Sequence, residues 1–162
     1  PLGGMLAIAD EEKLYLLEFA DHKKLKKKLE HLELYSHSAI TPGETRILDS
    51  IKQELDLYFV GKLQNFSTPT HIEGSEFQSL IWHALREIPY GETISYSQLA
   101  ANINRPLARR AAANANSANR FSIIVPCHRV VGIGGKLGGY GGGVHRKRWL
   151  IAHERTFHPG KG

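Results

Sequence analysis

The first part of the chain alternates short apolar runs with polar turns, followed by a helical stripe. Residues 5–9 and 14–19 are apolar runs separated by the polar residues 10–13, and this pattern predicts a β-hairpin. A helix is expected next, with Asp21 as its N-cap. Three leucines spaced by three or four residues form its apolar stripe: Leu25, Leu29 and Leu32.

A second helix is predicted downstream, where apolar residues recur with a period of 3.6 between residues 47 and 59. Residues 41–44 (Thr-Pro-Gly-Glu) have the composition of a capping box with proline at the first helical position. Gly61 is expected to end this helix. Residues 62–74 carry no clear period and are interpreted as a strand or as a linker to a second unit.

The second half of the chain contains two capping boxes and is predominantly helical. Ser75 with Gln78 begins a helix whose apolar stripe runs to Ile88. Ser95 with Gln98 begins the next helix. A further helix is predicted over residues 106–118, and the tight turn before it matches a helix-turn-helix.

The helix at 106–118 is expected to face the core through one set of residues: Leu107, Ala111, Ala115 and Ala118. Arg110 then lies on the opposite face. The outer face of this helix carries unusually small side chains: Ala112, Ala113, Asn114 and Asn116. Small residues allow close approach to a partner, and they also simply favour the helix. The sequence leaves both explanations open.

The single cysteine, Cys127, lies in an apolar, β-branched run that predicts a buried strand broken by Pro126. His128 follows it directly. A thiol becomes a strong nucleophile as a thiolate, and a nearby histidine can act as the base when a third group orients it. A small buried thiol beside an incidental histidine is the alternative. After a glycine-dense loop at 132–143 comes a last helix, expected over 144–154.

The last helix is expected to turn Trp149, Leu150 and Ile151 inward and to place three cations outside: Arg146, Lys147 and Arg148. Charge also differs between the two halves of the chain. Residues 1–72 contain 9 Lys/Arg and 11 Asp/Glu, whereas residues 73–162 contain 12 Lys/Arg and 5 Asp/Glu. A basic excess confined to the half with the cysteine indicates a polyanionic partner such as nucleic acid. The five lysines at 23–28 are more simply interpreted as a solvated face.

These residues together carry a resemblance to a known family. Pro126-Cys127-His128-Arg129-Val130 resembles the active-site signature of the O6-alkylguanine-DNA alkyltransferases, also called methylated-DNA–protein-cysteine methyltransferases. Further matches run from about Phe77 to Glu154 and include Gly138-Gly139-Tyr140-Gly141-Gly142. The resemblance implies an α+β fold. A ribonuclease-H-like N-terminal domain would occupy residues 1–72, and a winged helix-turn-helix domain carrying the alkyl acceptor would occupy residues 73–162.

The resemblance also implies a site and a reaction. Glu154 would hold one nitrogen of His128, and the other nitrogen would take the proton of the Cys127 thiol. Asn119 would link the recognition helix to the cysteine segment, and Tyr96 would donate a proton to the departing guanine. The alkyl group would pass irreversibly to Cys127 in a single turnover.

DNA contacts follow from the same resemblance. Arg110 would fill the gap left when the target base is flipped out through the minor groove, and Tyr96, Ser97 and Asn116 would also contact DNA. The base pocket is expected at Val130, Tyr140 and Gly141. The implied partner is double-stranded DNA containing O6-alkylguanine, and whether O4-alkylthymine is also accepted stays open.

No cofactor and no metal are expected, and the chain is expected to be a monomer in the cytoplasm, or in the nucleus of a eukaryote. Three other classes compete with this interpretation: a relative that binds damaged DNA without a nucleophile, a helix-turn-helix regulator, and a cysteine hydrolase. Cys127 argues against the first. A regulator would not need the Cys-His-Glu set, and a hydrolase would turn over repeatedly.

Overall fold

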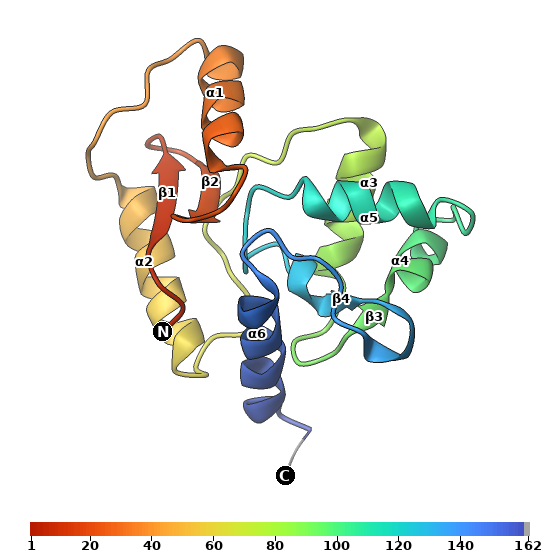
Figure 1. Cartoon of the computed structure of the whole chain (residues 1–162). Coiled ribbons are helices and arrows are strands. Elements are labelled where there is room, and N and C mark those ends of the chain that lie inside the picture. The colour runs from red at the N-terminus through yellow and green to blue at the C-terminus, as the bar shows by residue number, and fades with distance from the viewer. Residues whose placement is uncertain (161–162) are drawn as a thin grey trace. The chain divides into compact units, whose positions relative to one another are not determined.

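In the computed structural model, which describes residues 1–160, the chain forms two compact units (Figure 1). The first unit is Pro1–Ile72 and the second is Glu73–Gly162. Among the described residues, no helix is both long enough and apolar enough to cross a membrane.

The first unit is built on the predicted hairpin. Strands β1 (Met5–Ala9) and β2 (Leu14–Phe19) pair antiparallel, with Met5 opposite Phe19 and an irregularity between Ile8 and Ala9. A bridge from Leu14 to Thr70 adds a short parallel contact, because the Leu14 amide donates to the Pro69 carbonyl. Within residues 62–74, which the sequence predicts to be a strand or a linker, Thr70 therefore makes a strand-like bridge.

Two helices complete the first unit, and neither begins where its predicted cap lies. Helix α1 (Leu25–Ser36) follows Lys24, which makes no side-chain cap, so the expected Asp21 cap is wrong. Helix α2 (Arg46–Phe59) is capped by Thr45, whose hydroxyl accepts from the Leu48 amide at 3.1 Å. The box at residues 41–44 is thus also wrong. Residues 21–24 and 41–45 are not helical, so neither predicted cap stands directly before a helix.

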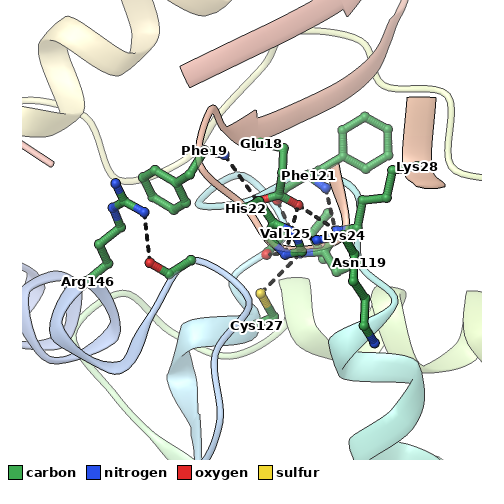
Figure 2. Close-up of polar contacts among 11 residues, drawn as sticks. Glu18, Phe19, His22, Lys24, Lys28, Asn119, Phe121, Val125, Cys127 and Arg146 are labelled. Atoms are coloured by element: carbon green, nitrogen blue, oxygen red, sulfur yellow. Dashed lines mark hydrogen bonds and ion pairs between the residues drawn. The ribbon is translucent and has the colours of Figure 1, made fainter. Parts of the chain in front are cut away.

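Two buried carboxylates tie the first unit together. Glu54 of α2 accepts hydrogen bonds from the backbone and the hydroxyl groups of Ser67 and Thr68, at 2.6–3.1 Å. Glu18 of β2 pairs with Lys28 at 2.6 Å, as Figure 2 shows. Lys28 is consequently not part of a solvated lysine face, whereas the other four lysines at 23–27 remain exposed.

The second unit begins with the two capping boxes that the sequence predicts. Ser75 opens helix α3 (Glu76–Arg86), and Ser95 opens helix α4 (Tyr96–Asn102); in both, the reciprocal side-chain and backbone bonds are present. Helix α5 (Arg109–Ser117) packs against α3, and the Trp82 indole donates to the Ala115 carbonyl at 2.9 Å.

The face that α5 turns inward differs from the prediction. Leu107 is fully exposed and Ala111 is exposed, while Ala112 and Asn116 are buried together with Ala115. The helix begins at Arg109 rather than at residue 106, so Leu107 belongs to the preceding turn. Within the helix the buried face runs through Ala112, Ala115 and Asn116, so it is turned by up to one residue, about 100°, from the predicted face.

A two-residue parallel ladder places the cysteine segment beside the start of α4. Strand β3 (Ile94–Ser95) pairs with β4 (Val130–Val131), with Ile94 opposite Val130. The 3₁₀ turn η1 (Cys127–Arg129) comes directly before β4, and η2 (Ile133–Gly135) follows it. Helix α6 (Val144–Thr156) packs against η1.

Candidate active site

The residues before Cys127 form a series of turns rather than the predicted strand, whereas Val130 and Val131 after it form strand β4 as expected. Ile123 is buried with a φ of 74°, in the left-handed region that β-branched residues rarely adopt. Such a conformation costs of order 1–3 kcal/mol and persists where the surroundings enforce it. An apolar run indicates burial, and here burial is achieved without an extended backbone.

Asn119 enforces this turn and reaches the nucleophile. Its side-chain oxygen accepts from the Phe121 amide at 2.9 Å, and its nitrogen donates to the Val125 carbonyl at 2.9 Å. The same nitrogen lies 3.2 Å from the Cys127 sulfur (Figure 2). A donor aimed at sulfur favours the thiolate over the thiol. Asn119 therefore contacts the cysteine segment at both Val125 and Cys127.

Cys127 itself is buried, with 7% of its surface exposed. Its backbone nitrogen donates to the Val125 carbonyl at 2.7 Å, which closes a tight turn centred on Pro126. The backbone carbonyl of Cys127 accepts a hydrogen bond from the side-chain nitrogen Nδ2 of Asn116 at 3.4 Å. Asn116 therefore lies inside the unit, and its predicted place on the outer face of the helix is wrong.

His128 and Glu154 form the predicted pair at the centre of the unit. Nε2 of His128 lies 2.7 Å from Oε1 of Glu154, and both side chains are fully buried. Burial lowers the pKa of His128, and the Glu154 carboxylate opposes that effect. The imidazole is thus neutral near pH 7.

The carboxylate decides which imidazole nitrogen carries the proton. Burial opposes ionisation of Glu154, but His128 and Arg129 together hold its pKa well below the ordinary value of 4.5. An ionised carboxylate can only accept, so Nε2 of His128 must donate to it. Nδ1 is left as a base, and among the described residues it has no hydrogen-bond partner.

Arg129 is a member of the site that the sequence reasoning did not single out. Its guanidinium donates to both Glu154 oxygens, at 2.8 and 3.0 Å, and to the Ile88 carbonyl at 2.7 Å. The Gly91 amide donates to the same carboxylate at 3.2 Å. Gly91 has a φ of 81°, and a Cβ there would come within 2.5 Å of His158. The only available signal was the position of Arg129 directly after the Cys-His pair.

A cavity of about 250 Å³ lies between α4, α5 and the glycine-dense loop. Its lining includes three predicted residues, Tyr96, Ser97 and Arg110, together with Arg109 and Ile133. The loop passes close to Tyr96, since a Cβ on Gly138 would lie 3.2 Å from the Tyr96 hydroxyl. Cys127 does not line this cavity, and neither do the predicted pocket residues: Val130 is buried, Tyr140 is half-buried and Gly141 is exposed.

Two cations of α6 are buried, contrary to the prediction. Arg146 is 6% exposed and donates to the Gly142 carbonyl at 2.9 Å, while Lys147 is completely buried. Arg148 is exposed as expected. Buried residues occur on most sides of α6, so a rule that places charges outside fails for this helix.

The geometry therefore defines a thiolate-generating site in a unit that also presents two exposed arginines beside a cavity. Comparison with protein families agrees with this description. Residues 76–156 match the 6-O-methylguanine DNA methyltransferase DNA-binding domain, and residues 1–72 match the ribonuclease-like domain of the same methyltransferase.

The chain belongs to the methylated-DNA–protein-cysteine methyltransferase family. It is 41% identical to the methylated-DNA–protein-cysteine methyltransferase of Methanosarcina acetivorans, over 95% of this chain and 93% of that protein. It is also 41% identical to the Salmonella typhimurium protein of the same name, over 95% of this chain and 91% of that protein. The structure resembles Mycobacterium tuberculosis OGT in complex with DNA, with a TM-score of 0.84, 37% identity, and coverage of 98% and 91% of the two chains.

Proposed function

We propose that the protein repairs O6-alkylguanine in DNA by one irreversible transfer of the alkyl group to Cys127. The observation that carries the proposal is the buried Cys127–His128–Glu154 set in a unit that matches a methylguanine methyltransferase DNA-binding domain. The unit of residues 73–162 would thus both bind DNA and accept the alkyl group. Double-stranded DNA is the proposed partner, and the Mycobacterium tuberculosis relative has been solved in complex with DNA.

Proton transfer comes first in the proposed mechanism. Nδ1 of His128 takes the thiol proton through a water molecule, while Glu154 holds the opposite nitrogen. The contact from Asn119 favours the sulfur anion that results. Because both His128 and Glu154 are buried, their attraction is weakly screened by solvent.

Alkyl transfer follows by an in-line displacement. The Cys127 sulfur forms a bond to the alkyl carbon as the carbon–O6 bond breaks, and the electron pair of that bond stays with the guanine. Tyr96 donates its hydroxyl proton to guanine N3. The proton that His128 took from the thiol then replaces the proton lost by Tyr96, so the number of protons is conserved. Burial raises the pKa of Tyr96, with a smaller effect from Cys127, so its hydroxyl is protonated and ready to donate. The thioether product has no leaving group, which limits each protein to one reaction.

The target base must leave the duplex, at a cost of a few kcal/mol. Arg110 is exposed at the cavity beside Ser97 and Tyr96, which supports a role in filling the vacated stack from the minor groove. The flipped base would lie against the backbone of Val130 and Gly141 and the ring of Tyr140. Asn116 is too deeply buried to contact DNA and would instead support the Cys127 carbonyl.

The protein is proposed to act as a monomer in a reducing compartment such as the cytoplasm, because the reaction needs Cys127 as a thiol. The deciding experiment is intact mass spectrometry after incubation with an O6-methylguanine duplex. One methyl increment per chain is expected, none with the unmodified duplex, and none in Cys127→Ser, which should still bind DNA. A sequence-specific regulator would gain no mass. Methylation of the Cys127→Ser variant would show that the acceptor lies elsewhere.

A further inference from the structure

Lys147 is a buried charge that neither the fold nor the proposed mechanism uses. It lies in the first turn of α6 and is completely inaccessible to solvent. Among residues 1–160 its Nζ has no hydrogen-bond partner and no ion pair. The ring of Tyr96 lies beside the ammonium group, with its centroid 5.8 Å from Nζ.

An ammonium group in this position is costly. Removing a cation from water without a partner is strongly unfavourable even after the protein relaxes. The first turn of a helix adds to the cost, because its unpaired amides already carry partial positive charge. A contact with an aromatic ring offsets only part of this cost. The position therefore favours an anion close to Lys147.

The titratable groups around the nucleophile narrow the choice of anion. Glu154, on the same helix, is fully engaged by His128, Arg129 and the Gly91 amide. Tyr96 has its pKa raised, so it is neutral. Cys127 remains. Helix α6, which carries Lys147, packs against η1, which begins at Cys127. Burial lowers the pKa of Lys147, and a negative charge on Cys127 opposes this effect.

We propose that the Lys147 ammonium is the counter-ion of the Cys127 thiolate. The inference rests on the proposed function in that Cys127 is the nucleophile. Three groups then divide the work of making the anion. His128 removes the thiol proton, Asn119 donates a hydrogen bond to the sulfur, and Lys147 of helix α6 supplies the compensating positive charge. Lys147 then has no ion-pair partner among the described residues because its partner, the negative charge on Cys127, exists only when the thiol is ionised.

The test measures the apparent pKa of Cys127 from the rate of iodoacetamide alkylation against pH, without DNA. Lys147→Met should raise this pKa by about one unit, which is a ten-fold loss of thiolate at lower pH. Lys147→Arg keeps the charge and should restore much of the effect. Arg148→Met removes the exposed neighbouring cation and should change nothing. An unchanged pKa in Lys147→Met would overturn the proposal.

A reciprocal measurement leaves Lys147 intact and so does not depend on how its variants fold. The coupling between two charges is mutual. The pKa of Lys147, followed by NMR of its side chain, should therefore fall in Cys127→Ala relative to the unaltered protein. Equal values in the two proteins would refute the pairing. Neither measurement involves alkylated DNA, so failure here with normal methyl transfer would leave the proposed function standing and remove only the counter-ion.

Discussion

The most informative perturbation is at the Glu154 carboxylate, because Glu154→Gln keeps its shape and removes its charge. The carboxylate carries out two separable tasks. It orients and supports His128 through a 2.7 Å contact, and it neutralises Arg129 through two bonds of 2.8 and 3.0 Å. A single variant at Glu154 disrupts both tasks, so a partner variant is needed to separate them.

Arg129→Met is that partner variant. It breaks the same ion pair from the other side and leaves the contact between Glu154 and His128 in place. Breaking a buried pair typically costs about 3–5 kcal/mol, since the remaining charge is left without compensation. Arg129 is 6% exposed and Glu154 is fully buried, so both variants should lose free energy of unfolding in this range.

The two variants should differ in the pKa of His128. Burial lowers this pKa, Glu154 raises it, and Arg129 lowers it further. Glu154→Gln should therefore lower the pKa of His128, and Arg129→Met should raise it. Loss of a supported general base costs about 10²–10⁴ in rate. We expect a slowing of this order in Glu154→Gln and less than ten-fold in Arg129→Met.

The assay combines single-turnover methyl transfer across pH with NMR titration of the imidazole. If Arg129→Met slows transfer as much as Glu154→Gln does, the loss comes from damaged packing and the relay is wrong. An unchanged pH–rate profile in Glu154→Gln would refute it as well. Stability gives a further check. Because the folded pKa of Glu154 lies below the ordinary 4.5, its stabilisation is complete above that value and declines as pH falls below it. The difference in free energy of unfolding between the unaltered protein and Glu154→Gln should therefore become smaller as pH falls below 4.5.

The remaining predictions concern one residue in each unit. Arg110→Ala should slow transfer from duplex DNA ten-fold or more, at ~1.4 kcal/mol per decade of rate, and should leave the reaction with free O6-benzylguanine nearly unchanged. Arg109→Ala is the matched control, and equal slowing of Arg110→Ala on both substrates would exclude a role in base flipping. In the other unit, burial would raise the pKa of Glu54, but hydrogen bonds from Ser67 and Thr68 lower it. Glu54→Gln should cost about 1.5–3 kcal/mol of unfolding free energy at pH 7 and less below pH ~4.5, measured by denaturant titration, and an equal cost at both pH values would contradict this account.

Local signals in the sequence were sufficient wherever one short segment determines its own structure. The boxes at Ser75 and Ser95 satisfy orphan amides within four residues, so no distant contact is needed to predict them. The hairpin of β1 and β2 is equally local. The caps expected at Asp21 and at residues 41–44 failed because a polar residue caps only where a helix is about to begin, and the packing of the apolar stripe sets that point.

The cysteine segment shows a different limit. Its apolar composition correctly indicates burial, but the conformation depends on Asn119 binding Phe121 and Val125, and on the left-handed turn at Ile123. The motif nevertheless identified Cys127, His128 and Glu154 together, although the last two are 26 residues apart in sequence. The motif carries this long-range information, and periodicity does not.

Polar residues buried in the last two helices account for what sequence reasoning missed in the site. Asn116 and Lys147 were placed on outer faces because polar side chains usually avoid the interior. Each is buried at a cost in free energy. Asn116 donates a hydrogen bond to the Cys127 carbonyl, and Lys147 is the proposed counter-ion of the Cys127 thiolate. A periodicity rule assumes that stability alone decides which face turns inward. It fails at these positions because the reaction needs donors and charges around a sulfur anion, and the rest of the unit supplies the stability that makes their burial possible.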